Sequence, residues 1–360
     1  MVFKTYKMND MKGKQGLVCM GLLLVLSSCS CHTGKQITAS GLQRKDFQTE
    51  VNGQHTDLFT LSNKQGMEVC ITNYGARVVS ILVPDRNGKR KDVVCGFSTI
   101  TEYMEQRQNF GSTVGRYIGR ILNARFTLDG VEYKLVPNNG KSGHISHGGN
   151  PGFADRIWKV EQADTHRVCL SYLSPDGENG FPGNLKVTLV YSLGEDDNAL
   201  DLTYEATTDA PTVLNLSHHS FFNISGNFTK SVEDQQLWVD ADRFTPYDDK
   251  KCVTGEYLQV AGTPLDFRMP HAIGECIDAD HPQLKVVNGY DHTWELNTKG
   301  DDTRPAAWVY DPASGRKMEI FTTEPGMQIY TGNGLKGKMT GKGGIAYPFR
   351  SAVCFETMHF

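Results

Sequence analysis

From about Asp46 to the C-terminus, apolar residues recur with a period close to two, as in the segments 185–193 and 200–206. Side chains two apart lie on the same face of a strand, so this pattern is typical of half-buried strands. No segment of about twelve residues keeps a helical period, although 101–106 could form a helical turn or two. Antiparallel strands without crossover helices cannot build a doubly wound parallel sheet. The chain is therefore predicted to be all-β, either a large antiparallel β-sandwich or a barrel.

Turn signals fall between the predicted strands. Asn87-Gly88, Asp129-Gly130 and the segment 311–315 each separate two apolar stretches, which is the pattern of a hairpin. The chain holds 37 glycines and is 10% aromatic, as expected of a protein rich in turns and strands. Neither a change of composition nor an internal repeat interrupts residues 46–360, so we expect one domain there.

The charge balance and the cysteines narrow the functional classes. The 37 Lys and Arg against 41 Asp and Glu give a formal net charge of -4. Without an excess of positive charge the chain cannot neutralise a phosphate backbone, so no nucleic-acid partner is expected. The nine cysteines show no paired C-x-x-C spacing of the zinc or redox type. We expect most of them to be unpaired core residues.

The N-terminal region has the pattern of an export signal. Four lysines precede an apolar run over 17–26, which is too short to span a bilayer but suits a signal-peptide core. The run ends in Leu26-Ser-Ser-Cys29, which resembles the lipobox of bacterial lipoproteins. We therefore predict a lipoprotein signal peptide over 1–28, lipidation of Cys29 and a polar tether over 29–45. An ordinary signal peptide with an incidental cysteine is the alternative, and Met11 is an alternative start.

Two adjacent histidines stand in the apolar segment 212–223. If this segment is a strand, alternation places His219 with Asn215 and Ser217 on the more polar face, and His218 on the opposite face. A concave site could hold His219 there, whereas the alternative is a core histidine bonded to backbone. Neighbours on a strand point in opposite directions, so joint metal binding by the two histidines is disfavoured.

A second pair, His144 and His147, precedes two glycines. Histidines three apart share a face only on a helix, and the flanking glycines disfavour a helix, so a zinc site is not expected here. A histidine beside glycines on a loop is better suited to contact a ligand, because the absent side chains let the backbone approach closely.

Two acidic residues are further site candidates. Glu356 lies within an apolar strand-like segment, 351–360, where an unpaired carboxylate is costly to bury. It must have partners, stay solvated in a cleft or carry a raised pKa, and each of these makes it a candidate. The alternative is an edge-strand glutamate that faces solvent. Asp291 is expected on a loop beside aromatic residues, where alone it would more often be a turn residue than a ligand.

Taken in order, these segments resemble the aldose 1-epimerase (galactose mutarotase) family over essentially all of 46–360. The matching stretches are Asn73-Tyr-Gly-Ala76, 114–121, His147-Gly-Gly149, 174–184, 215–223, Gly289-Tyr-Asp-His292, 328–333 and the strand that contains Glu356. Each motif is weak alone, but eight in the right order are specific. The resemblance implies a large β-sandwich of the galactose mutarotase-like supersandwich type with an open cleft, and neither a metal nor an organic cofactor.

The resemblance also implies the chemistry. Glu356 would take the proton of the C1 hydroxyl of a free aldose such as galactose or glucose, while His219, as the imidazolium, gives a proton to the ring oxygen. A carboxylate-rich surrounding would keep His219 protonated and Glu356 ionised near neutral pH. Reclosure on the other carbonyl face gives the other anomer.

The remaining family positions concern sugar binding. His147 is expected to bind near the ring oxygen or to share the acid role. Arg120, Asp291 and Gln328 match positions that hold sugar hydroxyls, since charged and amide groups orient a polyol.

The alternatives differ in class. Relatives continue past the glutamate strand, so a chain that stops at Phe360 is expected to be a truncated form with an exposed sheet edge. The first alternative function is therefore a lipid-anchored carbohydrate-binding protein without turnover. The second, an epimerase-like relative for hexose phosphates, would need more cations in the cleft than Arg120. In the leading interpretation the protein is a monomeric isomerase in the bacterial cell envelope, in the periplasm or at the outer membrane, held to the membrane only by its lipid anchor.

Overall fold

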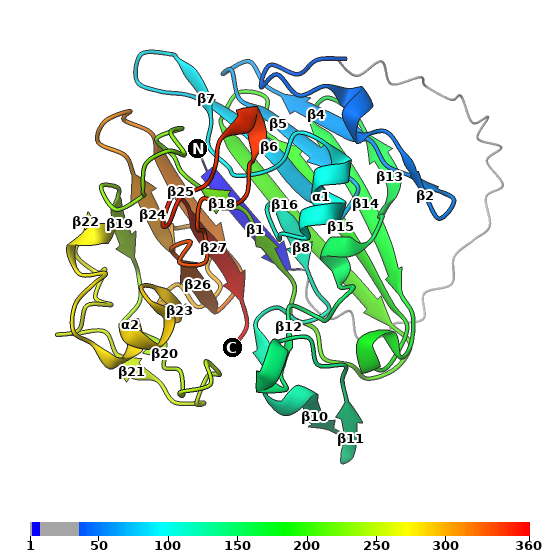
Figure 1. The fold of residues 1–360 in the computed structure, drawn as a ribbon, viewed down its shortest axis with the longest axis vertical. Helices are drawn as coiled ribbons and strands as arrows, with labels where there is room; N and C mark the ends of the chain where they lie inside the picture. The colour runs from blue at the N-terminus through cyan, green and yellow to red at the C-terminus, as the bar shows by residue number, and fades with distance from the viewer. Residues whose placement is uncertain (1, 8–35) are drawn as a thin grey trace.

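The computed structural model of the protein describes residues 2–7 and 36–360, which fold mainly into strands (Figure 1). These residues contain two α-helices, α1 (Ile100–Gln106) and α2 (Pro282–Val287). The first confirms the predicted helical turn, and Thr99 and Glu102 form a capping box at its start. Helix α2 was not predicted, because six residues are too few to give a helical period.

The largest sheet has nine strands in the order β13-β14-β15-β16-β1-β25-β24-β19-β22. The bounds are β13 Lys159–Ala163, β14 Arg167–Ser174, β15 Leu185–Leu193, β16 Ala199–Thr208, β1 Val2–Lys7, β25 Lys317–Thr322, β24 Ala307–Tyr310, β19 Gln236–Val239 and β22 His271–Ala272. Strand β1 pairs in parallel with both β16 and β25. Every other pairing in this sheet is antiparallel.

A six-stranded and a four-stranded sheet make up most of the rest. The six strands, in spatial order, are β18 Phe221–Phe222, β27 Val353–Met358, β26 Gly326–Tyr330, β23 Asp291–Glu295, β20 Arg243–Thr245 and β21 Leu258–Gln259. The four are β4 Leu58–Ser62, β5 Glu68–Thr72, β6 Arg77–Pro84 and β7 Arg90–Asp92. Four further pairs are β17 Ser217–His219 with β8 Ser112–Val114, β9 Arg120–Ile121 with β12 Ile145–Ser146, β10 Arg125–Leu128 with β11 Val131–Lys134, and β2 Glu50–Val51 with β3 Gln54–His55.

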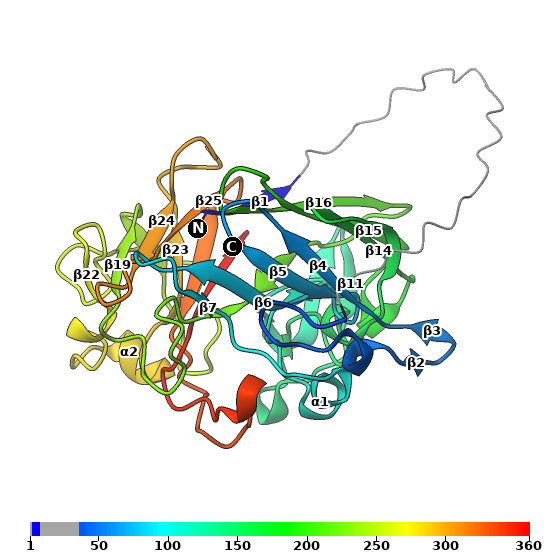
Figure 2. The ribbon, with the colours of Figure 1, turned by 90° about the horizontal axis from the view of Figure 1, so that it is seen from above.

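The sheets stack as a sandwich. Seen from above, the nine-stranded sheet forms one layer and the smaller sheets lie against it (Figure 2). The main apolar core joins side chains of all three sheets, such as Ile71, Leu189 and Ile329. Burial alternates along β15, as the period of two requires. The predicted large antiparallel β-sandwich is thus confirmed, and the three predicted hairpin turns join β6 to β7, β10 to β11 and β24 to β25.

The N-terminal predictions fall largely outside the described residues. The apolar run and Cys29 lie there, so the leader and its lipidation stay predictions. Val2–Lys7, within the same predicted leader, forms β1, and cleavage before Cys29 would leave β16 and β25 without the strand between them. No helix among the described residues is long and apolar enough to span a bilayer.

Candidate active site

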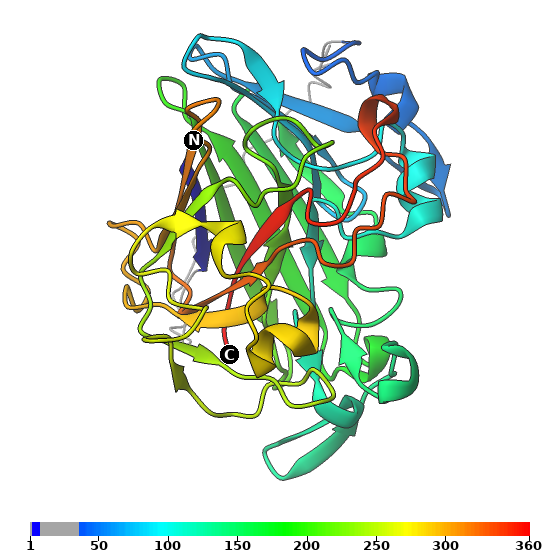
Figure 3. The same cartoon turned by 60° about the vertical axis from the view of Figure 1, so that its left-hand side comes forward.

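The six-stranded sheet carries the candidate site, and its register explains why. Figure 3 turns this sheet toward the viewer, with the C-terminal strand β27 in red. Phe221 of β18 is paired with Cys354 of β27, and His219, the last residue of β17, precedes Phe221 by two positions. Because the two segments are antiparallel, His219 comes to the level of Glu356, two positions after Cys354. On the other side of β27, Glu356 is paired with Gln328 of β26. Residues far apart in the sequence thus form one row on one face of the sheet.

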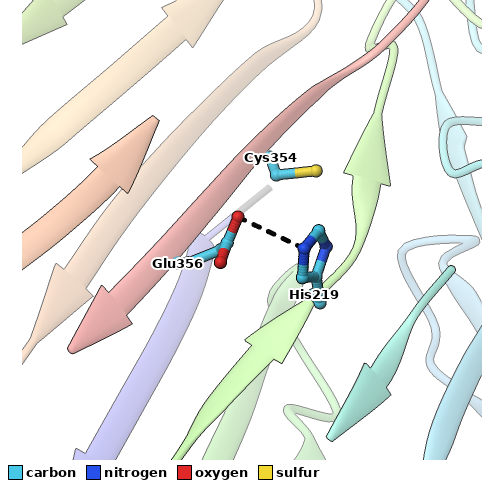
Figure 4. Close-up of side chains that lie close together, drawn as sticks. All are labelled: His219, Cys354 and Glu356. Carbon is cyan, nitrogen blue, oxygen red and sulfur yellow. Dashed lines mark ion pairs between the residues drawn. The ribbon is translucent and has the colours of Figure 1, made fainter. Parts of the chain in front are cut away.

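His219 and Glu356 are in direct contact. The Nε2 atom of His219 lies 3.4 Å from Oε1 of Glu356 (Figure 4). Both residues are buried, with exposed fractions of 5% and 2%. Strand β27 lies between β18 and β26, so the alternative of a solvent-facing edge glutamate is wrong. A buried carboxylate whose partner is an imidazole is suited to proton transfer.

The face assignment for the two adjacent histidines is confirmed. The ring of His219 stacks on Phe221 at 5.0 Å and meets the ring of His147 edge-on at 5.5 Å. His218 points to the opposite side, where its Nε2 is 2.7 Å from Oγ of Ser220 and its Nδ1 is 3.5 Å from the hydroxyl of Tyr191. The core-histidine alternative therefore describes His218 and not His219.

Burial sets the charge state of the pair. Desolvation lowers the pKa of His219 to about 4 and raises the pKa of Glu356 well above its usual value, with Asp291 raising it further and Arg120 opposing this. These shifts oppose the expected protonated His219 and ionised Glu356. The cause for His219 is burial, because its ring stacks on Phe221 and lies against His147, and the Glu356 carboxyl in contact with it is itself favoured in its neutral form. Both shifts favour the neutral form of each group, in which Glu356 is protonated and His219 is not.

Asp291 and Gln328 form a hydrogen-bonded unit next to this pair. The side-chain Nε2 of Gln328 donates to Oδ1 of Asp291 at 2.6 Å, and its Oε1 accepts from the hydroxyl of Thr293 at 3.0 Å. Burial raises the pKa of the Asp291 carboxyl, and Arg120 opposes this. Asp291 is the first residue of β23, one position beyond the loop on which it was predicted. These bonds fix which end of the Gln328 amide faces Asp291.

Arg120 and His147 approach from two short paired strands, β9 and β12. The Arg120 guanidinium lies over the ring of Tyr247 at 5.8 Å and donates to the carbonyl of Lys251, while its buried Nε has no partner in the described part of the chain. His147 has a φ of 52° and follows β12 directly. Burial, His219 and Arg120 lower its pKa to about 3, which favours the neutral imidazole and so opposes the predicted share in the acid role.

His144 does not reach this site. Its Nδ1 accepts a hydrogen bond from the backbone amide of Asn123, and the residue is fully buried. A metal site shared by His144 and His147 was not expected. Gly148, with a φ of 79°, explains the glycines here: a Cβ at this position would lie 1.9 Å from the carbonyl oxygen of Gly115.

All six predicted site residues line one open cleft, which holds about 690 Å³ of empty space including open solvent. This volume suits a small polar ligand such as a monosaccharide. Sequence reasoning missed several lining residues, namely Gln108, Asn109, Ser146, Phe221 and Tyr330. Of these, Phe221 lies two residues after His219, so strand alternation places it on the same face, and only the fold brings the others here.

A cysteine, Cys354, lies next to the pair of His219 and Glu356. His219, Cys354 and Glu356 each offer one ligand atom, and these atoms lie within 4.8 Å of one another. The described cysteines, Cys70, Cys95, Cys169, Cys252, Cys276 and Cys354, are all free thiols and mostly buried, as predicted.

Comparisons with known proteins agree with this architecture. The family model of aldose 1-epimerase matches residues 57–360. The chain is 38% identical to galactose mutarotase of Sus scrofa, over 84% of this chain and 85% of that protein, and 36% identical to aldose 1-epimerase of Escherichia coli K12, over 79% and 81%. Among solved structures, the GalM/aldose epimerase homologue from C. elegans matches with a TM-score of 0.77 at 30% identity, covering 84% of this chain and 89% of that one.

Proposed function

The chain belongs to the aldose 1-epimerase family, and we propose that it is an isomerase that interconverts the α and β anomers of free aldohexoses such as galactose or glucose. The observation that carries the proposal is the buried pair of His219 and Glu356 in an open cleft. Mutarotation removes one proton from the C1 hydroxyl and gives one to the ring oxygen, and both oxygens are bonded to C1. A base and an acid 3.4 Å apart fit this requirement.

Glu356 is the base and His219 the acid in this proposal. Glu356 accepts the proton of the C1 hydroxyl as the C1 carbonyl forms, and the bond between C1 and the ring oxygen breaks as His219 protonates that oxygen. Rotation about the C1–C2 bond of the open aldehyde exposes its other face. Reclosure runs the same two transfers in reverse, so both side chains return to their starting states.

The single shared proton makes the pair a self-contained catalyst. A neutral histidine with a protonated glutamate, and an imidazolium with a carboxylate, differ only in the position of that proton. Sugar hydroxyls that donate hydrogen bonds to Glu356 favour its carboxylate form, so binding of the sugar moves the proton to His219. The reaction then requires no exchange of protons with solvent.

The other predicted residues orient the sugar. Asp291 accepts and Arg120 donates hydrogen bonds to hydroxyls, whereas neutral His147 beside His219 holds the ring oxygen. Arg120 is the only Lys or Arg among the described residues that line this cleft, so a phosphorylated sugar is poorly matched. The substrate class is therefore a neutral aldose.

Polarimetry on freshly dissolved α-galactose and α-glucose with the purified full chain tests this proposal. We expect the optical rotation to reach equilibrium faster in proportion to the enzyme concentration. Saturable sugar binding with only the spontaneous rate would contradict the proposal and assign a carbohydrate-binding protein without turnover. Gel filtration in the same buffer tests the expected monomer.

We also propose that the protein is exported and anchored through acylated Cys29 in the bacterial cell envelope. The support is the short apolar run that ends in Leu26-Ser-Ser-Cys29. Acyl chains contribute about 0.8 kcal/mol for each buried CH₂, so several chains hold firmly. Cys29→Ala should appear unprocessed or in the soluble periplasmic fraction, and normal membrane retention of this variant would contradict the anchor. Mass spectrometry of the mature N-terminus decides whether β1 persists, since a chain cleaved before Cys29 lacks it.

A further inference from the structure

Cys354 is a buried thiol next to the proposed proton-transfer pair, and the proposed mechanism of mutarotation does not use it. It lies two residues before Glu356 on β27, so both side chains project from the same face of that strand. Its cross-strand partner is Phe221, whose ring stacks on His219. Figure 4 shows the thiol, the carboxylate and the imidazole converging.

The three side chains offer a nitrogen, a sulfur and an oxygen atom that all lie within 4.8 Å of one another. Zinc bonds of about 2.0 Å to N or O and 2.3 Å to S place the ligands of a tetrahedral ion roughly 3.3–3.8 Å apart. The nitrogen and oxygen of His219 and Glu356 are 3.4 Å apart, which is inside this range, and the sulfur of Cys354 lies no more than 4.8 Å from either of them. The geometry is close to that of a site with three protein ligands.

One buried atom of this group, Oε2 of Glu356, has no hydrogen-bond partner among the described residues. A buried polar atom without a partner is costly, and a ligand that enters the cleft relieves that cost. The donor set also selects the ion. Thiolate and imidazole favour Zn²⁺ and related thiophilic ions over Mg²⁺ or Ca²⁺, which prefer oxygen ligands.

We propose that His219, Cys354 and Glu356 form a binding site for a thiophilic divalent cation such as Zn²⁺, and that the bound ion blocks the sugar site. The thiol gives up its proton to solvent as the sulfur–metal bond forms, and the His219–Glu356 pair releases its shared proton to solvent as the bonds to nitrogen and oxygen form. The ion occupies the lone pairs of Glu356 and His219 that proton transfer uses, so metal and sugar exclude each other. The site is inhibitory, because the acid and the base are themselves the ligands.

Co²⁺ alone is the direct probe, since a cobalt–thiolate bond gives a charge-transfer absorption that oxygen and nitrogen ligands do not give. The full chain should show this band with one equivalent bound, and Cys354→Ser and Cys354→Ala should lose it. Cys95→Ser removes an equally buried thiol outside the cluster, and Cys169→Ser removes a more accessible one; both should keep the band. An unchanged band in the Cys354 variants, or no band in the parent, overturns the proposal.

Inhibition is the second readout, and it rests on the proposed function. Zn²⁺ should raise the apparent KM for the sugar in the parent, and the concentration needed should increase at least tenfold in Cys354→Ser, whose rate without metal stays at the parental value. Equal inhibition of both proteins would contradict the site. A parent without mutarotase activity but with the cobalt band would sink the proposed function and leave the metal site standing, so the two failures are distinguishable.

Discussion

The two faces of β17 each carry a buried histidine, but the two imidazoles have different partners. On the core face, both ring nitrogens of His218 lie within hydrogen-bond distance of hydroxyl groups of Ser220 and Tyr191. On the cleft face, His219 has one nitrogen against the Glu356 carboxyl group, and its other nitrogen has no side-chain partner among the residues that the structure describes. Both histidines are buried, and burial lowers the pKa of each to about 3 or 4.

Burial and residue type therefore do not separate the two residues. What differs is the partner: neutral hydroxyls fix one imidazole, whereas a carboxylate that can gain or lose a proton faces the other. A satisfied network stabilises a fold, and an unsatisfied one in an open cleft is available to a ligand. The comparison yields the following tests.

The largest expected effect comes from removing either member of the cleft pair. His219→Asn and Glu356→Gln should each slow mutarotation by roughly 10²- to 10⁴-fold, the usual contribution of a positioned acid or base. The double variant should lose little more than either single variant, because one transfer achieves little without the other. Polarimetry of the three variants checks this. Parental rates in both single variants would remove the pair from the mechanism.

A smaller effect on the rate is expected from a residue that binds the sugar but transfers no proton, such as Asp291. Asp291→Asn leaves the size of the side chain unchanged but removes the carboxylate that accepts from Gln328. We expect a KM higher by about tenfold with kcat reduced much less, since charge-assisted hydrogen bonds contribute about 1.5–3 kcal/mol. Initial rates over a range of sugar concentrations separate the two constants. A loss confined to kcat would place Asp291 in the chemical step.

The alternation of the sequence was sufficient to predict which face of β17 each histidine occupies, but not to predict the charge state of the His219–Glu356 pair. Alternation alone assigned His218 and His219 to opposite sides, because a strand has a fixed period. The charge state of the pair could not be predicted, since it depends on Phe221 and His147 covering the imidazole, and these contacts follow from the tertiary fold. The nearness of Cys354 to His219 likewise depends on the register between β18 and β27.

Local turn residues explain two smaller differences between the predicted and the observed secondary structure. Asp291 was expected on a loop because Asn288 and Gly289 precede it, and both have positive φ, but the turn ends before β23 begins. Helix α2 begins with Pro282 at its first position and ends before Asn288, which has a left-handed conformation. Both are typical of helix ends, but six residues are too few to show a helical period.

The matched control on the core face is His218→Asn. It removes a buried ring beside Tyr191 and leaves the Ser220 hydroxyl without its 2.7 Å partner. We expect a loss of about 1–3 kcal/mol in the free energy of unfolding and a mutarotation rate within a few-fold of the parent. Urea unfolding and polarimetry on the same preparation measure both. A rate loss as large as that of His219→Asn would abolish the distinction between the faces.

The last effect is one that the two faces should share, namely the dependence of stability on pH. Burial lowers the pKa of four histidines to about 3 or 4, which are His147, His218, His219 and His292. In the unfolded chain each of these histidines titrates near 6.5, so below about pH 6.5 the unfolded state binds protons that the folded state does not bind. Stability is therefore unaffected by these groups above that pH and falls as the pH decreases from about 6.5 toward 4, by up to about 1.4 kcal/mol per pH unit for each histidine.

The raised pKa values of Glu356 and Asp291 act in the opposite direction, because the folded state holds those protons at a pH where the unfolded chain has lost them. Two carboxyls offset part of the effect of four histidines, so the net change on acidification is a loss of stability. Urea unfolding at pH 7, 6 and 5 should show it, and His218→Asn and His219→Asn should each reduce the slope by about one proton. Equal reductions would establish that both faces bury a neutral imidazole, so that the difference in mutarotation rate between the two variants comes from the partner of each ring. A slope unchanged in His219→Asn would mean instead that this imidazole already carries its proton in the folded protein, as an ion pair with Glu356 before any sugar binds.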